Sequence, residues 1–264
     1  MLPRLVVVGG GRMGTALVRG LLAAGWASTE IVVVEASDER RARLEDELRG
    51  VRVAAEPVAG DGAVVAVKPA QGEAACRALG AHAPARALSI MAGVTLADLG
   101  AWLGPGTAAL RAMPNTPALV GAGVSGLAGA DGVGEADFVW AEGILGAVGR
   151  VVRVPESDLD AVTGLSGSGP AYVFLVAEAL VAAGEAAGLS RAVSEALALP
   201  TVAGAGRLLL ETGDSPEALR AQVTSPGGTT EAGIAVLEDR GLREAVAAAV
   251  AAATARSREL GRRP

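Results

Sequence analysis

The chain has 264 residues, a net charge of −6 and a pI near 5.0, which allows one large domain or two ordinary ones. Its acidic balance, without a basic tract carrying interleaved aromatics, argues against a nucleic-acid partner. One cysteine, Cys76, excludes an internal disulfide, and one histidine, His82, leaves no Cys/His cluster for a metal. No signal peptide is visible, and the most apolar long window, 171–189, contains Glu178 and Glu185. We therefore expect a cytoplasmic protein that does not enter a membrane.

Short apolar strands alternate with helices in the first half of the chain. The predicted strands are 5–8, 31–34, 51–53, 63–67, 87–91 and 108–112. An apolar-periodic helix follows the first strand, up to residue 24, and a charged helix at 39–49 follows the second. This alternation is typical of a parallel sheet covered by helices on both faces. Residues 1–155 are therefore predicted to form a doubly wound α/β domain.

The pattern changes near Pro155, and no strand is predicted from Asp158 onward. Helices are expected at 159–165, 171–187, 190–212, 216–224, 230–240 and 242–259. Residues 156–264 are therefore predicted to be an all-helical second domain. Its helices are apolar on more than one face, which favours a homo-oligomer, with a compact monomeric bundle as the alternative.

A glycine-rich loop lies between the first predicted strand and the first helix. Gly9, Gly11 and Gly14 fit the pattern G-x-G-x-x-G, with Arg12 and Met13 between the last two glycines. The first glycine permits a tight turn, the second lets a pyrophosphate approach the backbone, and the third lets helix and strand pack closely. The strand–loop–helix context predicts dinucleotide binding, against the alternative of an ordinary glycine-rich turn.

The residues after the second strand leave the choice of dinucleotide open. Glu35 ends that strand 21 residues after Gly14, where an acid can accept hydrogen bonds from a ribose 2′-hydroxyl and so favours NAD. Ser37, Arg40 and Arg41 follow at once, and they are groups that a 2′-phosphate, as in NADP, would require. Either cofactor is therefore compatible with this loop.

Further candidates follow later strands, at the edge where ligands bind in open α/β folds. Lys68 is the only lysine among 23 basic residues, and it precedes Pro69 directly after a strand. Ala92 and Gly93 follow the next strand and leave room for a flat nicotinamide ring. Asn115 lies in a stiff proline-bracketed loop and is expected either to bind an amide or substrate group or to satisfy the loop backbone.

The segment Ser225-Pro226-Gly227-Gly228-Thr229-Thr230 joins two predicted helices. Adjacent glycines allow consecutive N–H groups to face one way, and the following helix N-terminus favours an anion. The three hydroxyls can donate or accept hydrogen bonds. The turn therefore suits a small carboxylate beside a polar atom, and the alternative is a Pro-Gly turn followed by a helix cap.

Over nearly its full length, the chain resembles the pyrroline-5-carboxylate reductase family. The motifs that carry the resemblance are 9–14, 66–69 (AVKP), 91–94 (MAGV), 111–117 (RAMPNTP), 163–172 (TGLSGSGPAY) and 223–230 (VTSPGGTT). The resemblance implies NAD(P)H-dependent reduction of L-1-pyrroline-5-carboxylate to L-proline. It also implies a Rossmann domain, a helical dimerisation domain, dimers often assembled into rings, and an active site shared between subunits.

The resemblance also assigns roles to residues of this chain. It implies that Ser225 and the N–H groups of Gly228 and Thr229 hold the substrate carboxylate, with the Thr230 hydroxyl beside the ring nitrogen. It places the glycine loop, Val67, Lys68 and Ala92 on the dinucleotide, beside the edge candidates Pro69 and Gly93, with Gln222 contacting the cofactor from the partner chain. Many members carry a polar run such as Asn-Arg-Ser where this chain has Glu35-Ala36-Ser37, which puts the usual NADPH preference in doubt.

Reduction of a cyclic imine requires positioning more than a reactive side chain. A protonated imine is already electrophilic, so Thr230 is expected to orient the nitrogen and Lys68 to place the nicotinamide ribose or a water. One rival is a hydroxyacid dehydrogenase or imine reductase of the same plan. Hydroxyacid dehydrogenases of that plan use a lysine on the interdomain helix, which this chain lacks. A second rival is a dinucleotide-sensing or membrane-tethered interaction protein that keeps the fold without turnover, against which the intact 225–230 turn argues.

Overall fold

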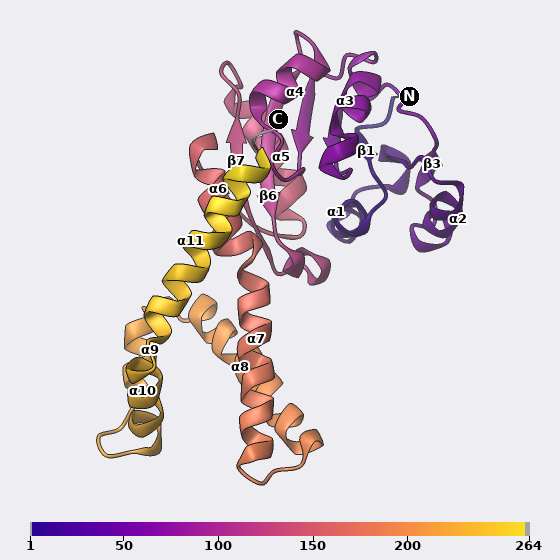
Figure 1. Ribbon diagram of the computed structural model, residues 1–264. Helices are drawn as coiled ribbons and strands as arrows, with labels where there is room; N and C mark the ends of the chain where they lie inside the picture. The colour runs from indigo at the N-terminus through magenta and orange to yellow at the C-terminus, as the bar shows by residue number, and fades with distance from the viewer. Residues whose placement is uncertain (1, 262–264) are drawn as a thin grey trace. The chain divides into compact units, whose positions relative to one another are not determined.

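The computed structural model describes residues 2–261 (Figure 1). The chain forms two compact units, Met1–Gly167 with Ala252–Pro264, and Ser168–Ala251. The first unit extends past the expected border at residue 155 because helix α6 (Leu159–Val162) buries Leu159 in a core cluster of the sheet domain. Helix α11 (Leu242–Gly261) begins in the second unit and ends in the first.

One sheet organises the first unit. Within residues 2–261 its eight strands lie in the order β3-β2-β1-β4-β5-β6-β7-β8, and all neighbouring pairs are parallel except β6 and β7. The strands are β1 Leu5–Val8, β2 Ile31–Val34, β3 Arg52–Ala54, β4 Gly62–Val65, β5 Arg86–Ser89, β6 Ala108–Pro114, β7 Gly123–Gly129 and β8 Gly149–Arg153. The six predicted strands are present, whereas β7 and β8 were not predicted.

Helices cover both faces of this sheet. They are α1 Arg12–Ala23, α2 Asp38–Glu47, α3 Gly72–Gly80, α4 Leu96–Leu103, α5 Glu135–Gly146 and α6, joined by short helical turns. Because side chains alternate along a strand, Val7 enters one core with Leu17 of α1, whereas Val6 enters a second core with Leu99 of α4. The doubly wound Rossmann-type architecture is thereby confirmed.

Helices alone build the second unit, as predicted, over the residues 168–251 that the structure describes. They are α7 Gly169–Ala186, α8 Arg191–Glu211, α9 Pro216–Gln222, α10 Thr229–Asp239 and the first part of α11. Ser190 and Ser215 cap α8 and α9 by accepting hydrogen bonds from Val193 N and Ala218 N. A π-helical segment, Thr163–Gly167, precedes α7.

The helices of the second unit bury little within the chain. Over the fully described span α7–α10, Val181 and Ser194 are the buried residues. By length and composition alone, Glu156–Ala186 and Arg191–Glu211 are apolar enough to cross a membrane, with mean hydropathies of 1.4 and 1.3. Apolar residues such as Leu175 (65% exposed) and Leu210 (62%) line these helices, so a further surface is required to cover them.

Candidate active site

The carboxyl ends of β1, β2 and β4 meet at one edge of the sheet. Gly9 N donates to Val34 O at 2.8 Å, and Ala66 N donates to Val8 O at 2.7 Å. The strand order changes direction between β1 and β4, which is the position where open α/β sheets bind ligands. Two segments predicted to bind the cofactor, 9–14 and 66–69, therefore lie together at this edge.

The three motif glycines have different physical reasons to be glycine. Gly9 has φ +112°, and a Cβ there would lie 2.6 Å from Ala66 O. A Cβ on Gly14 would collide with Gly9 O. By contrast, a Cβ on Gly11 would meet nothing within 4 Å. Gly9 and Gly14 are thus required by the fold, whereas Gly11 leaves open space at the loop surface.

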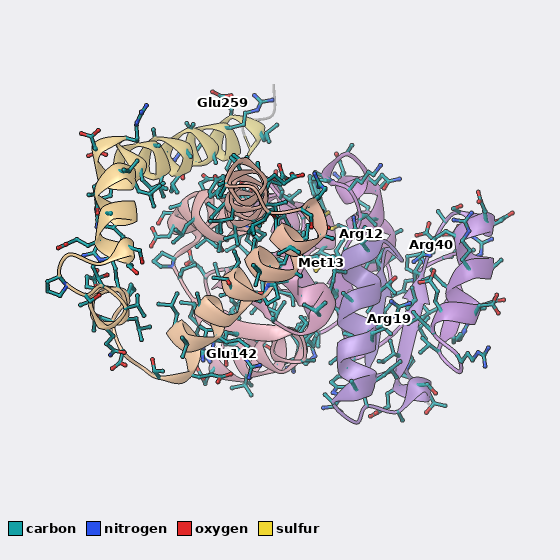
Figure 2. The ribbon with its side chains drawn as sticks, turned by 90° about the horizontal axis from the view of Figure 1, so that it is seen from below. Arg12, Met13, Arg19, Arg40, Glu142 and Glu259 are labelled. Carbon is teal, nitrogen blue, oxygen red and sulfur yellow. The ribbon has the colours of Figure 1, made fainter. Side chains whose placement is uncertain are left out.

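That open space lies over the N-terminus of α1. Gly11 is the N-cap residue and provides no side-chain cap, so the first N–H groups of the helix have no internal acceptor. Arg12 is exposed at the first helical position, and Met13 packs against the core (Figure 2). Unpaired donors, a helix dipole and space for close approach fit the pyrophosphate of a dinucleotide.

The next loops along the edge carry the remaining first-unit candidates. Lys68 is exposed, and its ammonium makes no hydrogen bond or ion pair with any residue in 2–261. Ala92 is exposed, and Gly93 has φ +72°. A Cβ on Gly93 would lie 3.3 Å from Leu260 O, so the last turn of α11 supports this loop from behind.

Asn115 is committed to the backbone around it. Its Nδ2 donates to Ser166 O at 3.1 Å, its Oδ1 accepts from Val124 N at 2.9 Å, and the residue is 8% exposed. The amide therefore ties β6 to β7 and to the turn before α7. Of the two expectations for Asn115, these contacts favour the structural one, although its partners lie outside its own loop.

A partly buried ion pair that sequence reasoning missed lies beside this edge. Arg111 Nη1 donates to Glu156 Oε1 at 3.0 Å, and the same oxygen accepts from Leu96 N at 2.7 Å. Glu156 thus joins β6 to the first residue of α4, which follows the 92–95 loop. The nearby proline and the acidic run 156–160 do not distinguish Glu156 in the sequence, because its partners are distant.

In the second unit, residues 225–228 form a tight turn before α10. Gly228 N donates to Ser225 O at 3.0 Å, and Gly227 has φ +70°, as a Pro-Gly type II turn requires. In this conformation the Gly228 N–H, which was expected to bind the substrate carboxylate, closes the turn instead. A Cβ on Gly228 would lie 2.5 Å from Ser225 Oγ, so glycine keeps that hydroxyl close to the turn.

The open donors of this turn lie at the start of α10. Thr229 and Thr230 occupy the first two helical positions, where helix geometry leaves N–H groups without an intrahelical acceptor. Their hydroxyls make no hydrogen bond within the described residues. Gly227 N instead donates to Glu231 Oε2 at 2.7 Å, so a carboxylate of the protein already sits at this turn. The turn therefore has the chemistry to receive a carboxylate.

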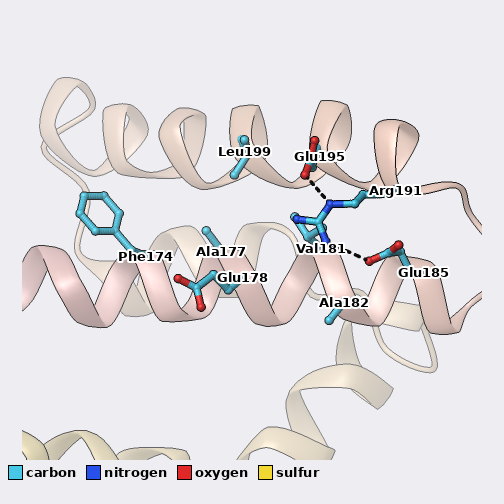
Figure 3. Close-up of a pocket in the computed structure, with 9 residues that line it drawn as sticks. All are labelled: Phe174, Ala177, Glu178, Val181, Ala182, Glu185, Arg191, Glu195 and Leu199. Atoms are coloured by element: carbon cyan, nitrogen blue, oxygen red, sulfur yellow. Dashed lines mark hydrogen bonds and ion pairs between the residues drawn. The ribbon is translucent and has the colours of Figure 1, made fainter.

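Helices α7 and α8 enclose a groove of about 520 Å³ in the second unit (Figure 3). Arg191 spans it, with its guanidinium 2.9 Å from Glu195 and 3.7 Å from Glu185. Gln222 lies on α9, where its Nε2 donates to Asp214 Oδ2 at 3.4 Å. None of the proposed substrate residues lines the groove, whose lining combines apolar residues with the charged side chains of Glu178, Glu185, Arg191 and Glu195.

Comparison with known proteins identifies both halves of the chain. Residues 156–260 match the family model "Pyrroline-5-carboxylate reductase dimerisation". Residues 4–93 match the model "NADP oxidoreductase coenzyme F420-dependent". The first match covers the exposed helices of the second unit, and the second covers the glycine loop and the sheet edge.

Relatives of known name extend along the whole chain. A pyrroline-5-carboxylate reductase from Synechocystis is 44% identical over 98% of this chain and 99% of its own. A solved pyrroline-5-carboxylate reductase from Coxiella burnetii is 38% identical, with a TM-score of 0.93 over 100% of both chains. The Plasmodium falciparum enzyme, solved with NADP bound, is 28% identical, with a TM-score of 0.83 over 98% of both chains. This chain therefore belongs to the pyrroline-5-carboxylate reductase family.

Proposed function

We propose that this chain reduces L-1-pyrroline-5-carboxylate to L-proline with NAD(P)H, the last step of proline biosynthesis. The observation that carries the proposal is the full-length similarity to named reductases at 44% identity. The physical features of the chain agree with it. A glycine edge suited to a dinucleotide and a turn suited to a carboxylate are what this reaction requires.

The first unit supplies the dinucleotide contacts. Gly9, Gly11, Arg12, Met13 and Gly14 present the loop and the N-terminus of α1 to the pyrophosphate, with Glu35 and Ser37 at the adenosine ribose. The nicotinamide half of the cofactor is contacted by a second group of residues, Val67, Lys68, Pro69, Ala92 and Gly93. The unpaired Lys68 ammonium is free to bind the nicotinamide ribose.

The second unit supplies the substrate contacts. The hydroxyl of Ser225 and the N–H groups of Thr229 and Thr230 receive the carboxylate, with Gly228 shaping the turn. Glu231 has to release the Gly227 N–H if the substrate carboxylate takes that donor. We keep Asn115 as a supporting residue of the site, because its amide orders the loop after β6.

The reaction adds two electrons and two protons in total to the C=N bond of the ring. When bound, the reduced nicotinamide supplies a hydride to the imine carbon. The imine nitrogen gains a proton, and the Thr230 hydroxyl holds that nitrogen in place. Positioning of the two reactants supplies most of the acceleration, so Thr230 and Lys68 are the residues proposed to act at the reacting atoms.

Self-association follows from the dimerisation family of residues 156–260 and from their exposed apolar faces. We further propose a homodimer whose active sites each combine residues of two subunits, with Gln222 reaching the partner's cofactor, and rings of such dimers. Gly11→Val and Thr230→Ala subunits, each strongly impaired alone, are then expected to reach about a quarter of wild-type activity when refolded together. Mixtures that form heterodimers but are no more active than the separate variants contradict the shared site.

A cytoplasmic location, with neither a membrane nor a nucleic acid as partner, completes the proposal. The acidic net charge disfavours binding to nucleic acid. The apolar faces of helices 156–186 and 191–211 are proposed to be covered by a second subunit, and not by lipid. Fractionation of cells that express the chain, with and without salt washing, tests this. Recovery of the protein in the washed membrane pellet overturns it.

The decisive assay follows absorbance at 340 nm with purified protein, NADH or NADPH, and pyrroline-5-carboxylate. Oxidation of the nucleotide that depends on the imine, with formation of L-proline, supports the proposal. Oxidation with neither nucleotide, by a protein that still binds one of them, supports the rival of a sensor without turnover. A matched reaction with a 2-hydroxy acid and NAD tests the hydroxyacid dehydrogenase rival.

A further inference from the structure

The peptide group of Gly10 is fixed from both sides by Glu35, directly after β2, by Arg40 of α2 and by Thr15 of α1. Glu35 Oε2 accepts from Gly10 N at 3.1 Å, and Glu35 Oε1 accepts from Ser37 N at 3.0 Å. Arg40 Nε donates to Gly10 O at 2.8 Å, and Thr15 Oγ1 donates to the same oxygen at 3.2 Å. We call Glu35, Arg40 and Thr15 with this peptide the Gly10 clamp.

The clamp uses every nitrogen of the Arg40 guanidinium. Nη1 donates to Glu47 Oε1 at 2.6 Å, and Nη2 donates to Thr15 Oγ1 at 3.2 Å and to Glu47 Oε2 at 3.3 Å. Arg40 thus reaches from α2 toward α1 (Figure 2), where Arg19 also pairs with Glu47 at 3.3 Å. A phosphate bound by Arg40 would have to break contacts that hold the glycine loop.

The other two groups suited to a phosphate are also engaged. Arg41 Nη1 donates to the carbonyls of Glu35 and Ala36, both at 2.8 Å, and its Nη2 pairs with Asp38. The Ser37 hydroxyl accepts from Arg40 N at 3.3 Å and caps α2. Ser37, Arg40 and Arg41 therefore build the loop, while the Glu35 carboxylate is fixed at the end of β2.

From this arrangement we infer that the enzyme prefers NADH to NADPH, with Glu35 as the specificity-determining residue and Arg40 as a positioning residue. A fixed carboxylate accepts hydrogen bonds from a ribose diol, whereas it repels a 2′-phosphate, and the guanidinium groups of Arg40 and Arg41 beside it are already engaged. The inference rests on the proposed function. The Plasmodium falciparum relative was solved with NADP bound, so the shared fold by itself does not exclude a 2′-phosphate.

Two measurements on the same purified protein test the inference. Isothermal titration gives Kd for NADH and NADPH without the imine, and steady-state kinetics give kcat/KM for each nucleotide with pyrroline-5-carboxylate. We expect NADH to be favoured at least about ten-fold in both, since like charges at an interface are strongly disfavoured. Equal values, or a preference for NADPH, overturn the inference while leaving the reductase function intact.

Variants separate the two roles. Glu35→Ser removes the carboxylate and is expected to bring the two Kd values within about three-fold of each other. Arg40→Gln is expected to weaken both nucleotides by equal factors, because it loosens the Gly10 peptide. A loss confined to NADPH shows instead that Arg40 binds the 2′-phosphate, and it overturns the assignment.

Arg43→Gln is the matched control, since Arg43 lies on the same helix, is exposed and pairs with Glu39. It is expected to change neither Kd. Binding without turnover of any nucleotide contradicts the proposed function, and the Kd ratio then still decides the inference about Glu35.

Discussion

The two units of this chain differ in how far they bury their apolar side chains and pair their polar groups. In the first unit, β1, β2 and β4 are buried along their whole lengths, and the glycine loop beside them is held by the Gly10 clamp. In the second unit, the long helices α7 and α8 bury one residue each within the chain, and the hydroxyls of Thr229 and Thr230 have no partner among the described residues.

This contrast separates what the chain completes alone from what it leaves to association. The glycine loop at the dinucleotide edge is preformed, because internal contacts fix the Gly10 peptide and the Glu35 carboxylate before any ligand arrives. The helical unit keeps its apolar surface and its polar turn open. Burial on dimerisation is therefore expected to contribute much of the stability of α7 and α8, as in obligate dimers.

The largest expected effect breaks the preformed edge. Gly14→Ala places a methyl group against Gly9 O and is expected to cost roughly 3 kcal/mol, lowering Tm by about 6–12 °C and abolishing nucleotide binding. Gly11→Ala is the matched control, because φ is −71° and the space is open. We expect its Tm to be unchanged, and differential scanning calorimetry with nucleotide titration checks both. Equal Tm losses in the two variants would contradict the conclusion that the fold requires glycine at position 14 but not at position 11.

The next effect concerns the open turn. Thr230→Ala is expected to lower kcat by roughly ten-fold to a thousand-fold, the scale for losing one oriented hydrogen bond in a transition state. Nucleotide affinity should not change, since the hydroxyl belongs to the substrate turn. Thr230→Ser, which keeps the hydroxyl, serves as the control in steady-state kinetics. Near-normal kcat and KM in the alanine variant would exclude this role for Thr230.

A third change addresses the open apolar faces. Leu175→Glu places a carboxylate on α7 at a position 65% exposed in the chain. If a second copy covers this face, the dimer dissociation constant should rise at least about a hundred-fold, because the charge is buried without a partner. Val120→Glu, at an 81% exposed position of the first unit, is the control. Sedimentation velocity showing an unchanged dimer for Leu175→Glu argues against an interface there.

Asn115 provides a test within the first unit. Asn115→Ala leaves Ser166 O and Val124 N without their partner and is expected to cost about 2–4 kcal/mol. Thr116→Ala, at an exposed neighbouring position, should be neutral. Chemical denaturation measures both. A variant of normal stability whose KM for the imine rises would restore Asn115 to direct substrate binding.

The smallest effect concerns an exposed ion-pair network. Hydrogen bonds from Arg153 lower the pKa of Glu135 and of Glu142 below the ordinary 4.5. Because the folded pKa values are depressed, the stabilisation is present above about pH 4.5 and is lost as pH falls through them. The Tm difference between wild type and Arg153→Gln should therefore shrink on acidification. It should also shrink in 1 M salt, and a difference independent of both pH and salt is the contrary result.

Strand β7, one of the two strands that sequence reasoning missed, lacks a local sequence signal for a physical reason. Strand β7 has the sequence GVSGLAG, which is poor in β-branched residues. A Cβ on Gly126 would lie 2.9 Å from Val162, and one on Gly129 would lie 2.7 Å from Phe138. Packing against distant residues selects glycine there, so local propensity gives no signal for the strand.

In the candidate site, too, the residues with local contacts were predictable and those with distant contacts were not. The glycine loop was predictable because its residues are close in sequence and their spacing reflects local geometry. The roles of Arg40 and Glu35 were left open, because the contacts of Arg40 with Gly10 and of Glu35 with the same peptide depend on how α2 packs beside α1. Asn115 was ambiguous for the same reason, since one of its partners lies 51 residues away.

Helix α11 gives the chain an unusual order of completion. Its last turns pack in the first unit, where Ser257 Oγ donates to Asp160 Oδ1 at 2.6 Å and Leu260 backs Gly93. The ribosome makes residues 252–261 only after the entire second unit has been synthesised. The first unit therefore cannot complete its packing during translation until the second unit has emerged from the ribosome.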